Sequence, residues 1–166
     1  VLYGVGHLLR KMDLSPGRIA IADNFQAATA PRYPLRGHQL GYRPKTNSYD
    51  GWTVPIWDQY IRDLALSGAN AIELIPPRSD DDADSPHFPL PPMAMMVEMS
   101  RVADAYGLDV WTWYPALEAD YTDPRIMEAA LREWSDVFRR LPRLDHVLVP
   151  GGDPGHTRPP VLFAFL

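Results

Sequence analysis

The sequence of 166 residues contains no cysteine. This absence excludes disulfide bonds, thiol nucleophiles and zinc sites built from cysteine, and it leaves the redox compartment open. Basic residues are also few: 16 Lys and Arg stand against 21 Asp and Glu, which gives a net charge of −5. Because a phosphate backbone is bound by clustered Lys and Arg, we do not expect a nucleic acid as a partner.

Long apolar runs are missing as well, so no segment is long enough to span a bilayer and no membrane partner is expected. The first residues do not form a signal peptide. The chain begins at Val1 and ends inside an apolar segment, so both ends look cut and the location stays open. The apolar content of 46% is enough for a sizeable core in a domain of ordinary size.

The first 31 residues differ in pattern from the rest. Apolar residues at helical spacing predict a helix over residues 1–12, and Ser15-Pro16-Gly17 is typical of a break. Residues 18–22 suit a short edge strand, and a linker containing Pro31 follows. We therefore expect residues 1–31 to be the end of a preceding small α/β domain and residues 32–166 to belong to the next domain.

From Pro34 onward, strands and helices alternate. The pattern predicts strands at residues 35–42, 71–75, 109–114 and 146–149, with helices at 54–67, 93–106 and from the N-cap Asp123 onward. Strand starts recur about every 37 residues, which is typical of βα units in a parallel sheet. The predicted class is α/β, a partial (β/α)8 TIM barrel of four units, because a complete barrel needs about 250 residues. A small open α/β sheet is the alternative.

A glycine-rich loop follows the fourth predicted strand. Gly151, Gly152 and Gly155 surround Asp153 and His156. Since ligands meet the sheet of an α/β protein at the carboxyl ends of its strands, Asp153 and His156 are candidate site residues. The alternative is a tight turn with no role beyond connection.

Two further strands carry candidates. Alternation along the second strand turns Glu73 toward the barrel interior, where Arg36 and His38 of the first strand would be its partners, in a structural ion pair or in substrate binding. The third strand offers Trp113 and Tyr114 and is followed by Glu118 and Asp120. Aromatic rings near carboxylates suit sugars, which present apolar C–H faces and hydroxyl groups. The tryptophans could equally belong to the core.

Metal sites are not indicated. Four aspartates at residues 80–84 lack the spacing of an EF-hand, so a solvated acidic loop is expected rather than a calcium site. A set made of His38, Glu73, Asp153 and His156 follows no ligand motif. No metal and no cofactor is expected.

Short motifs resemble the β-N-acetylhexosaminidases. The sequence PRYPLRG at residues 31–37 resembles the start of their catalytic barrel, where the arginine before glycine binds substrate hydroxyls, and residues 68–72 resemble the start of their second barrel strand. Residues 1–22 resemble the end of the small domain before the barrel in these enzymes and in α-glucuronidases. Gly-Gly-Asp at residues 151–153 resembles the Gly-Gly-Asp-Glu motif of the hexosaminidases, whose aspartate orients the acetamido group and whose glutamate is the general acid. Pro154 stands here in place of that glutamate.

The resemblance implies a glycoside hydrolase that cleaves O-glycosidic bonds of oligo- or polysaccharides with two carboxyl groups. Asp153 would be one of them, and Glu118, Asp120 or a residue beyond Leu166 the other. The residues expected to bind substrate are Arg36, His38, Glu73, Trp113, Tyr114, Asp120 and His156. A periplasmic or extracellular location agrees with the resemblance, and the oligomeric state stays open.

Two other functions remain. One is a carbohydrate-binding protein on a hydrolase scaffold without turnover, which Pro154 favours. The other is a barrel enzyme in which residues 151–157 hold a phosphate at a helix N-terminus, although the charge of Asp153 would repel an anion. In the hydrolase interpretation, the chain by itself should be inactive, because half a barrel leaves a strand edge and apolar faces uncovered.

Overall fold

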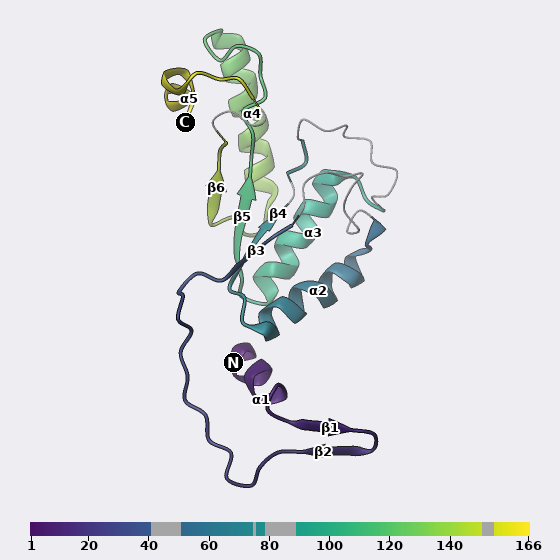
Figure 1. Cartoon of the computed structure of the whole chain (residues 1–166). Coiled ribbons are helices and arrows are strands. Elements are labelled where there is room, and N and C mark those ends of the chain that lie inside the picture. The colour runs from purple at the N-terminus through teal and green to yellow at the C-terminus, as the bar shows by residue number, and fades with distance from the viewer. Residues whose placement is uncertain (41–50, 75, 79–88, 151–154) are drawn as a thin grey trace.

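The computed structural model describes residues 1–40, 51–74, 76–78, 89–150 and 155–166. It confirms the predicted α/β class, with a parallel four-stranded sheet and five helices in this part of the chain (Figure 1). The strands are β3 (Gly37–Gln39), β4 (Ala71–Leu74), β5 (Asp109–Trp113) and β6 (His146–Leu148). They lie side by side in the order β3-β4-β5-β6 and are all parallel, as predicted. The predicted strand ends at Gly41, Tyr42 and Ile75 lie outside the described residues.

Three amphipathic helices follow β3, β4 and β5. They are α2 (Val54–Ser67), α3 (Pro92–Ala105) and α4 (Pro124–Arg140), and the short helix α5 (Pro159–Phe165) follows β6. In α2, Trp57, Ile61 and Ala65 recur every four residues and are buried. The predicted N-cap of α4 is confirmed, because the Asp123 side chain accepts a hydrogen bond from the backbone N–H of Arg125.

The hydrophobic core lies on the helix-covered face of the sheet. Ile72 and Val110, neighbours in the register of β4 and β5, are fully buried there and belong to one cluster with Met96 and Met99 of α3. Because side chains alternate along a strand, residues 73 and 111 must face the other way. Helices thus cover one face of the sheet and leave the second face for a different set of side chains.

An arginine fixes the amino-terminal edge of the sheet. Arg143 donates to Asp109 at 2.6 Å and to Asp145 at 2.7 Å, and Asp145 also accepts from the backbone N–H of Val110. Ser100 on α3 exchanges hydrogen bonds with the backbone of Arg143. These contacts hold the starts of β5 and β6 at one level.

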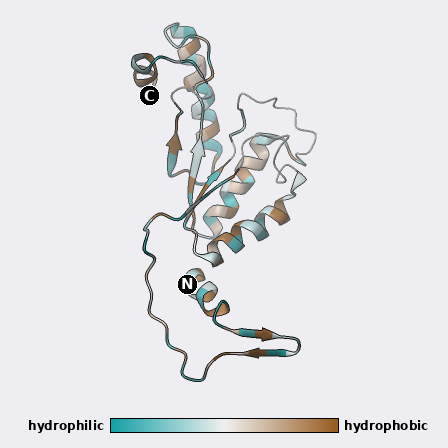
Figure 2. Cartoon of the chain, viewed as in Figure 1, coloured by the Kyte–Doolittle hydropathy of each residue, from teal (hydrophilic) through white to brown (hydrophobic). Residues whose placement is uncertain are grey.

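The first residues form a helix and a hairpin. Helix α1 (Leu2–Leu9) precedes the antiparallel strands β1 (Asp13–Ser15) and β2 (Arg18–Ala20). The predicted break at Ser15-Pro16-Gly17 is the hairpin turn, with Gly17 at φ 72°, and β1 was missed because three residues show no periodicity. Hydrophobic residues lie on both arms of the hairpin (Figure 2): Leu14 and Ile19 pair directly and are 64% and 70% exposed.

Helix α1 packs against the end of α2 rather than standing apart. A Cβ atom at Gly6 would overlap the backbone carbonyl of Leu66. Arg10 donates to that same carbonyl oxygen at 2.7 Å, and the Arg36 guanidinium lies 5.7 Å from the centre of the Tyr3 ring. The predicted domain boundary after residue 31 stays a prediction. No helix among the described residues is long and apolar enough to cross a membrane.

The contact at Gly6 gives a stability test. Gly6→Ala should lower the free energy of unfolding by about 1 to 3 kcal/mol, because the new methyl group forces α1 away from Leu66. Chemical denaturation of the 166-residue chain measures this. Trypsin should also cleave faster after Arg10 and Lys11.

Gly4→Ala is the matched control in the same helix. A Cβ atom there meets nothing within 4 Å, so alanine should be neutral or stabilise the helix by up to about 1 kcal/mol. Equal effects of the two substitutions would contradict the packing of α1 on α2.

Candidate functional site

A row of four side chains crosses the open face of the sheet. The register places Gln39, Glu73, Trp111 and His146 side by side, one from each strand. The Gln39 amide donates to Glu73 Oε1 at 3.5 Å, and the rings of Trp111 and His146 contact each other at a tilt of 37° with centroids 4.2 Å apart. Glu73 therefore faces the side of the sheet that was predicted to be the barrel interior.

Glu73 is the charged member of this row. It is partly buried, and this desolvation raises the pKa of its carboxyl, an effect that the hydrogen bond from Gln39 partly offsets. Beside it, the indole N–H of Trp111 is buried without a hydrogen-bond acceptor among the described residues. The row thus holds polar groups that the described part of the chain satisfies incompletely.

His38 does not share this face. It pairs with Ile72 on the helix-covered side, and its Nε2 lies 2.7 Å from the hydroxyl of Tyr60 on α2. The predicted pairing of Glu73 with His38 is wrong, because the register aligns Glu73 with Gln39 and side chains alternate along β3.

Arg36 lies at the opposite end of the strands from the predicted site. It precedes β3, and its guanidinium donates to the carbonyls of Gly68 at 2.6 Å, Tyr33 at 2.8 Å and Pro34 at 2.9 Å. A pocket of about 560 Å³ beside α1 includes Arg36 in its wall. Arg36 and His38 were expected to bind substrate together with residues at the carboxyl ends of the strands, but the structure places Arg36 at the amino ends and His38 on the helix-covered face.

The residues that follow β5 build the carboxyl edge. Trp113 ends the strand on the same face as Trp111 and is 8% exposed. Tyr114 continues the ladder, since its N–H donates to Leu148 at 2.8 Å, but its ring packs on Trp134 and Phe138 in the helix layer. Burial, reinforced by nearby Glu133, raises the pKa of the Tyr114 hydroxyl. Tyr114 is a core residue in this structure.

Asp120 stabilises a turn before α4. Its Oδ1 accepts from the hydroxyl of Thr122 at 2.6 Å and from the backbone N–H of Thr122 at 2.8 Å. These two hydrogen bonds lower the pKa of the Asp120 carboxyl. The side chain is exposed, and its contacts are those of an Asx turn.

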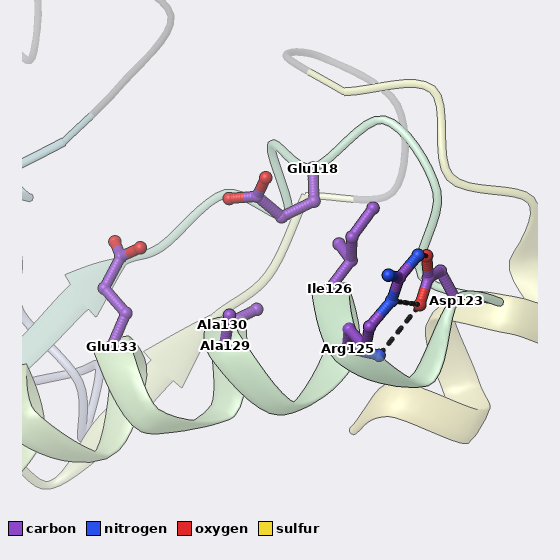
Figure 3. Close-up of a pocket in the computed structure, with 7 residues that line it drawn as sticks. All are labelled: Glu118, Asp123, Arg125, Ile126, Ala129, Ala130 and Glu133. Atoms are coloured by element: carbon purple, nitrogen blue, oxygen red, sulfur yellow. Dashed lines mark hydrogen bonds and ion pairs between the residues drawn. The ribbon is translucent and has the colours of Figure 1, made fainter.

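Glu118 lies in a pocket between this loop and α4. Figure 3 shows the carboxyl groups of Glu118 and Glu133 directed into the same space above the helix, and the pocket has a volume of about 440 Å³. Its wall is formed by Glu118, Asp123, Arg125, Ile126, Ala129, Ala130 and Glu133.

Arg78 joins the two carboxyl groups. One guanidinium nitrogen lies 2.7 Å from Glu118 Oε1 and 3.0 Å from Glu133 Oε2. Sequence reasoning missed Arg78. The signal was its position, because Arg78 directly follows Pro76 and Pro77 and so lies at the carboxyl end of β4. A carboxylate held by an arginine suits a nucleophile or a charge-stabilising group better than a proton donor.

The loops after β5 and β6 touch each other. Gly155, at φ 116°, lies so close to the backbone of Ala116 that a Cβ atom there would stand 2.7 Å from the Ala116 carbonyl oxygen. Ala116 is two positions from Glu118 in the sequence, and Gly155 is two positions from Asp153. His156 is exposed directly after Gly155. Asp153, with its neighbours Gly151, Gly152 and Pro154, lies outside the described residues.

Metal ligands do not converge in the part of the chain that the structure describes: no group of three His, Asp or Glu side chains there could hold an ion. The aspartates at residues 80–84 lie outside that part.

No protein-family model and no curated protein sequence matches the chain. Five chains among the solved structures do. One of them is CpGH84B, a glycoside hydrolase family 84 hexosaminidase, at 13% identity and a TM-score of 0.48. The match covers 70% of this chain and 20% of that one, so the present chain spans about a fifth of its length. The likeness is weak, and it says nothing about the fold class, activity or substrate of the present chain.

Glu73 provides a test by pH. Because burial raises its pKa above the ordinary 4.5, Glu73 destabilises the folded chain once the pH exceeds that value. Glu73→Gln should therefore stabilise the fold at pH 7, by less than about 1 kcal/mol because the residue is only half-buried, and should have no effect at pH 4. Urea denaturation at the two pH values measures both.

Glu128→Gln is the control. Glu128 is exposed on α4 and pairs with Arg132 at 3.0 Å. Its neutralisation should lower the free energy of unfolding by about 0.2–0.5 kcal/mol at pH 7. A loss of stability at pH 7 in Glu73→Gln would show that the Glu73 carboxylate is stabilising where it lies.

Proposed function

We propose that this chain forms the first four βα units of a (β/α)8 barrel that acts as a glycoside hydrolase. Residues 32–166 would belong to the barrel, and residues 1–31 would end a preceding small α/β domain. The sequential parallel order of β3 to β6 supports this proposal, as does the packing of α2, α3 and α4 against one face of that sheet. Further strands pairing with β3 and β6 would enclose the row of Gln39, Glu73, Trp111 and His146.

One observation carries the functional part of the proposal: the loops after β5 and β6 meet at the backbones of Ala116 and Gly155. The two proposed catalytic carboxyl groups, Glu118 and Asp153, belong to these loops. Glycoside hydrolysis needs two carboxyl groups that flank the bond, and two touching loops at the carboxyl edge of a parallel sheet are suited to supply them.

The roles follow from the environment of Glu118. Its carboxylate is held 2.7 Å from the Arg78 guanidinium, and a carboxylate fixed in this way can attack the anomeric carbon or stabilise positive charge that develops on the sugar ring. Asp153 is then the candidate for proton transfer to the leaving oxygen.

Substrate binding is assigned to groups near this edge. Trp113 lies at the end of β5 on the open face, and His156 is exposed on the loop after β6. An indole ring can pack against the C–H face of a sugar, and an imidazole can hydrogen-bond its hydroxyl groups. The substrate class is an oligo- or polysaccharide.

A second function is favoured by one residue. Pro154 follows Asp153 where the resembling enzymes carry their acid glutamate. A protein that binds carbohydrate on this scaffold without hydrolysing it would need no proton donor there.

Carboxamide substitutions test the proposal in the natural protein. Asp153→Asn and Glu118→Gln should each lower kcat about a hundredfold or more, since a general acid or base is worth that much and the changes are nearly isosteric. Steady-state hydrolysis of aryl glycosides, together with thermal melts, measures both effects. The isolated 166-residue chain should show no turnover.

Asp120→Asn is the control on the same loop, because Asp120 is bound within its own turn, and kcat should change less than about twofold. Unchanged kinetics in Asp153→Asn would remove Asp153 from the mechanism. Sugar binding by the wild-type protein without any hydrolysis would decide for the second function.

A further inference from the structure

We propose that Arg78 is a positioning residue that aims the carboxylate of Glu118 into the active site. This inference rests on the proposed function, because it assigns Glu118 to the chemistry. Arg78 comes from the loop after β4, Glu118 from the loop after β5, and Glu133 from α4. One guanidinium thus connects three segments that belong to two successive βα units.

The backbone of Glu118 is already fixed by other contacts. Its N–H donates to the hydroxyl of Tyr121 at 3.3 Å, and Tyr121 is buried with its ring 4.5 Å from that of Phe165 on α5. The side chain is partly exposed, and its described partner is Arg78 at 2.7 Å. The loop therefore sets where Glu118 lies, and Arg78 sets where its carboxylate points.

Electrostatics explain why an arginine is needed there. Glu118 and Glu133 both lie within hydrogen-bonding distance of one Arg78 nitrogen, so the two like charges are neighbours and would repel without it. The other groups at this place are Tyr114, which donates to Glu133 at 3.3 Å, Tyr121, and the pair of Asp123 and Arg125. Arg125 is engaged by Asp123 at 3.0 Å, which leaves Arg78 as the cation for Glu118 among the described residues.

Arg78 and Glu118 are partly exposed, with 45% and 29% of their side chains accessible. Ion pairs of this kind contribute little to stability. Substitution of Arg78 should therefore lower kcat strongly and change the melting temperature little. This difference separates a positioning role from a structural one.

The test uses the natural protein and an aryl glycoside that it hydrolyses. Arg78→Gln should lower kcat about tenfold or more and change KM less than about twofold, because the Glu118 carboxylate then loses its described partner while the proposed sugar-binding groups stay in place. Arg78→Lys should recover part of kcat by restoring the charge. The double variant R78Q/E133Q should also recover part of kcat, since the repelling charge is gone.

Arg132→Gln is the control: Arg132 is exposed on α4, pairs with Glu128 at 3.0 Å and does not line the pocket of Glu118, so kcat and KM should stay unchanged. Wild-type kinetics in Arg78→Gln would overturn the inference. An equal loss of kcat in Arg78→Gln and Arg78→Lys, accompanied by a fall in melting temperature, would also overturn it, because that pattern is typical of a structural residue.

A separate measurement distinguishes failure of this inference from failure of the proposed function. If the wild-type protein hydrolyses no glycoside, the proposed function fails, and the catalytic role of Arg78 fails with it. The pairing itself is tested without substrate by the guanidinium NMR signal of Arg78 at pH 7. This signal should shift in E118Q relative to the wild-type protein, and an unchanged signal overturns the pairing.

Discussion

The alternation of side chains along four parallel strands in register is the constraint on which the rest of this structure depends. It sends Ile72 and Val110 into the helix-covered core and Glu73 and Trp111 to the open face. A slip of one residue in β4 would exchange these sets and bury the Glu73 carboxylate under the helices. The contacts of Arg143 with Asp109 and Asp145 hold the starts of β5 and β6 level and so protect this register.

The same register brings the functional groups to one edge. Because β4, β5 and β6 are parallel and adjacent, the loops that follow them meet, and Arg78, Glu118 and Gly155 come from three successive loops of this kind. The amino edge is different in character: Arg36 and Arg143 there hold strand starts and loop carbonyls in place. Stability and the proposed chemistry are thus separated to opposite ends of the sheet, as in barrel enzymes.

Periodicity was enough to predict the four strands, their order, and helices α2 to α4, because burial on one face imposes spacing that is visible in the sequence. The strand β1 and the docking of α1 were not predictable, since they depend on contacts such as that of Gly6 with Leu66. At the site, alternation predicted that Glu73 and Ile72 lie on opposite faces of the sheet, as the register of β4 and β5 has them. The partners of Glu73 and the bridge by Arg78 depend on register and loop geometry, which single-strand patterns do not contain. The roles of Asp153 and Glu118 stay predictions.

The central claim is that the carboxyl edge of this sheet binds carbohydrate. Its most direct test is the indole N–H spectrum of the natural protein, in which this chain contributes five tryptophans, during titration with oligosaccharides of N-acetylglucosamine or glucuronic acid. The signals of Trp111 and Trp113 should shift in a saturable way, while those of Trp57 and Trp134 in the helix layer stay in place. Absence of any shift at millimolar sugar, or shifts confined to Trp57 and Trp134, would contradict the claim.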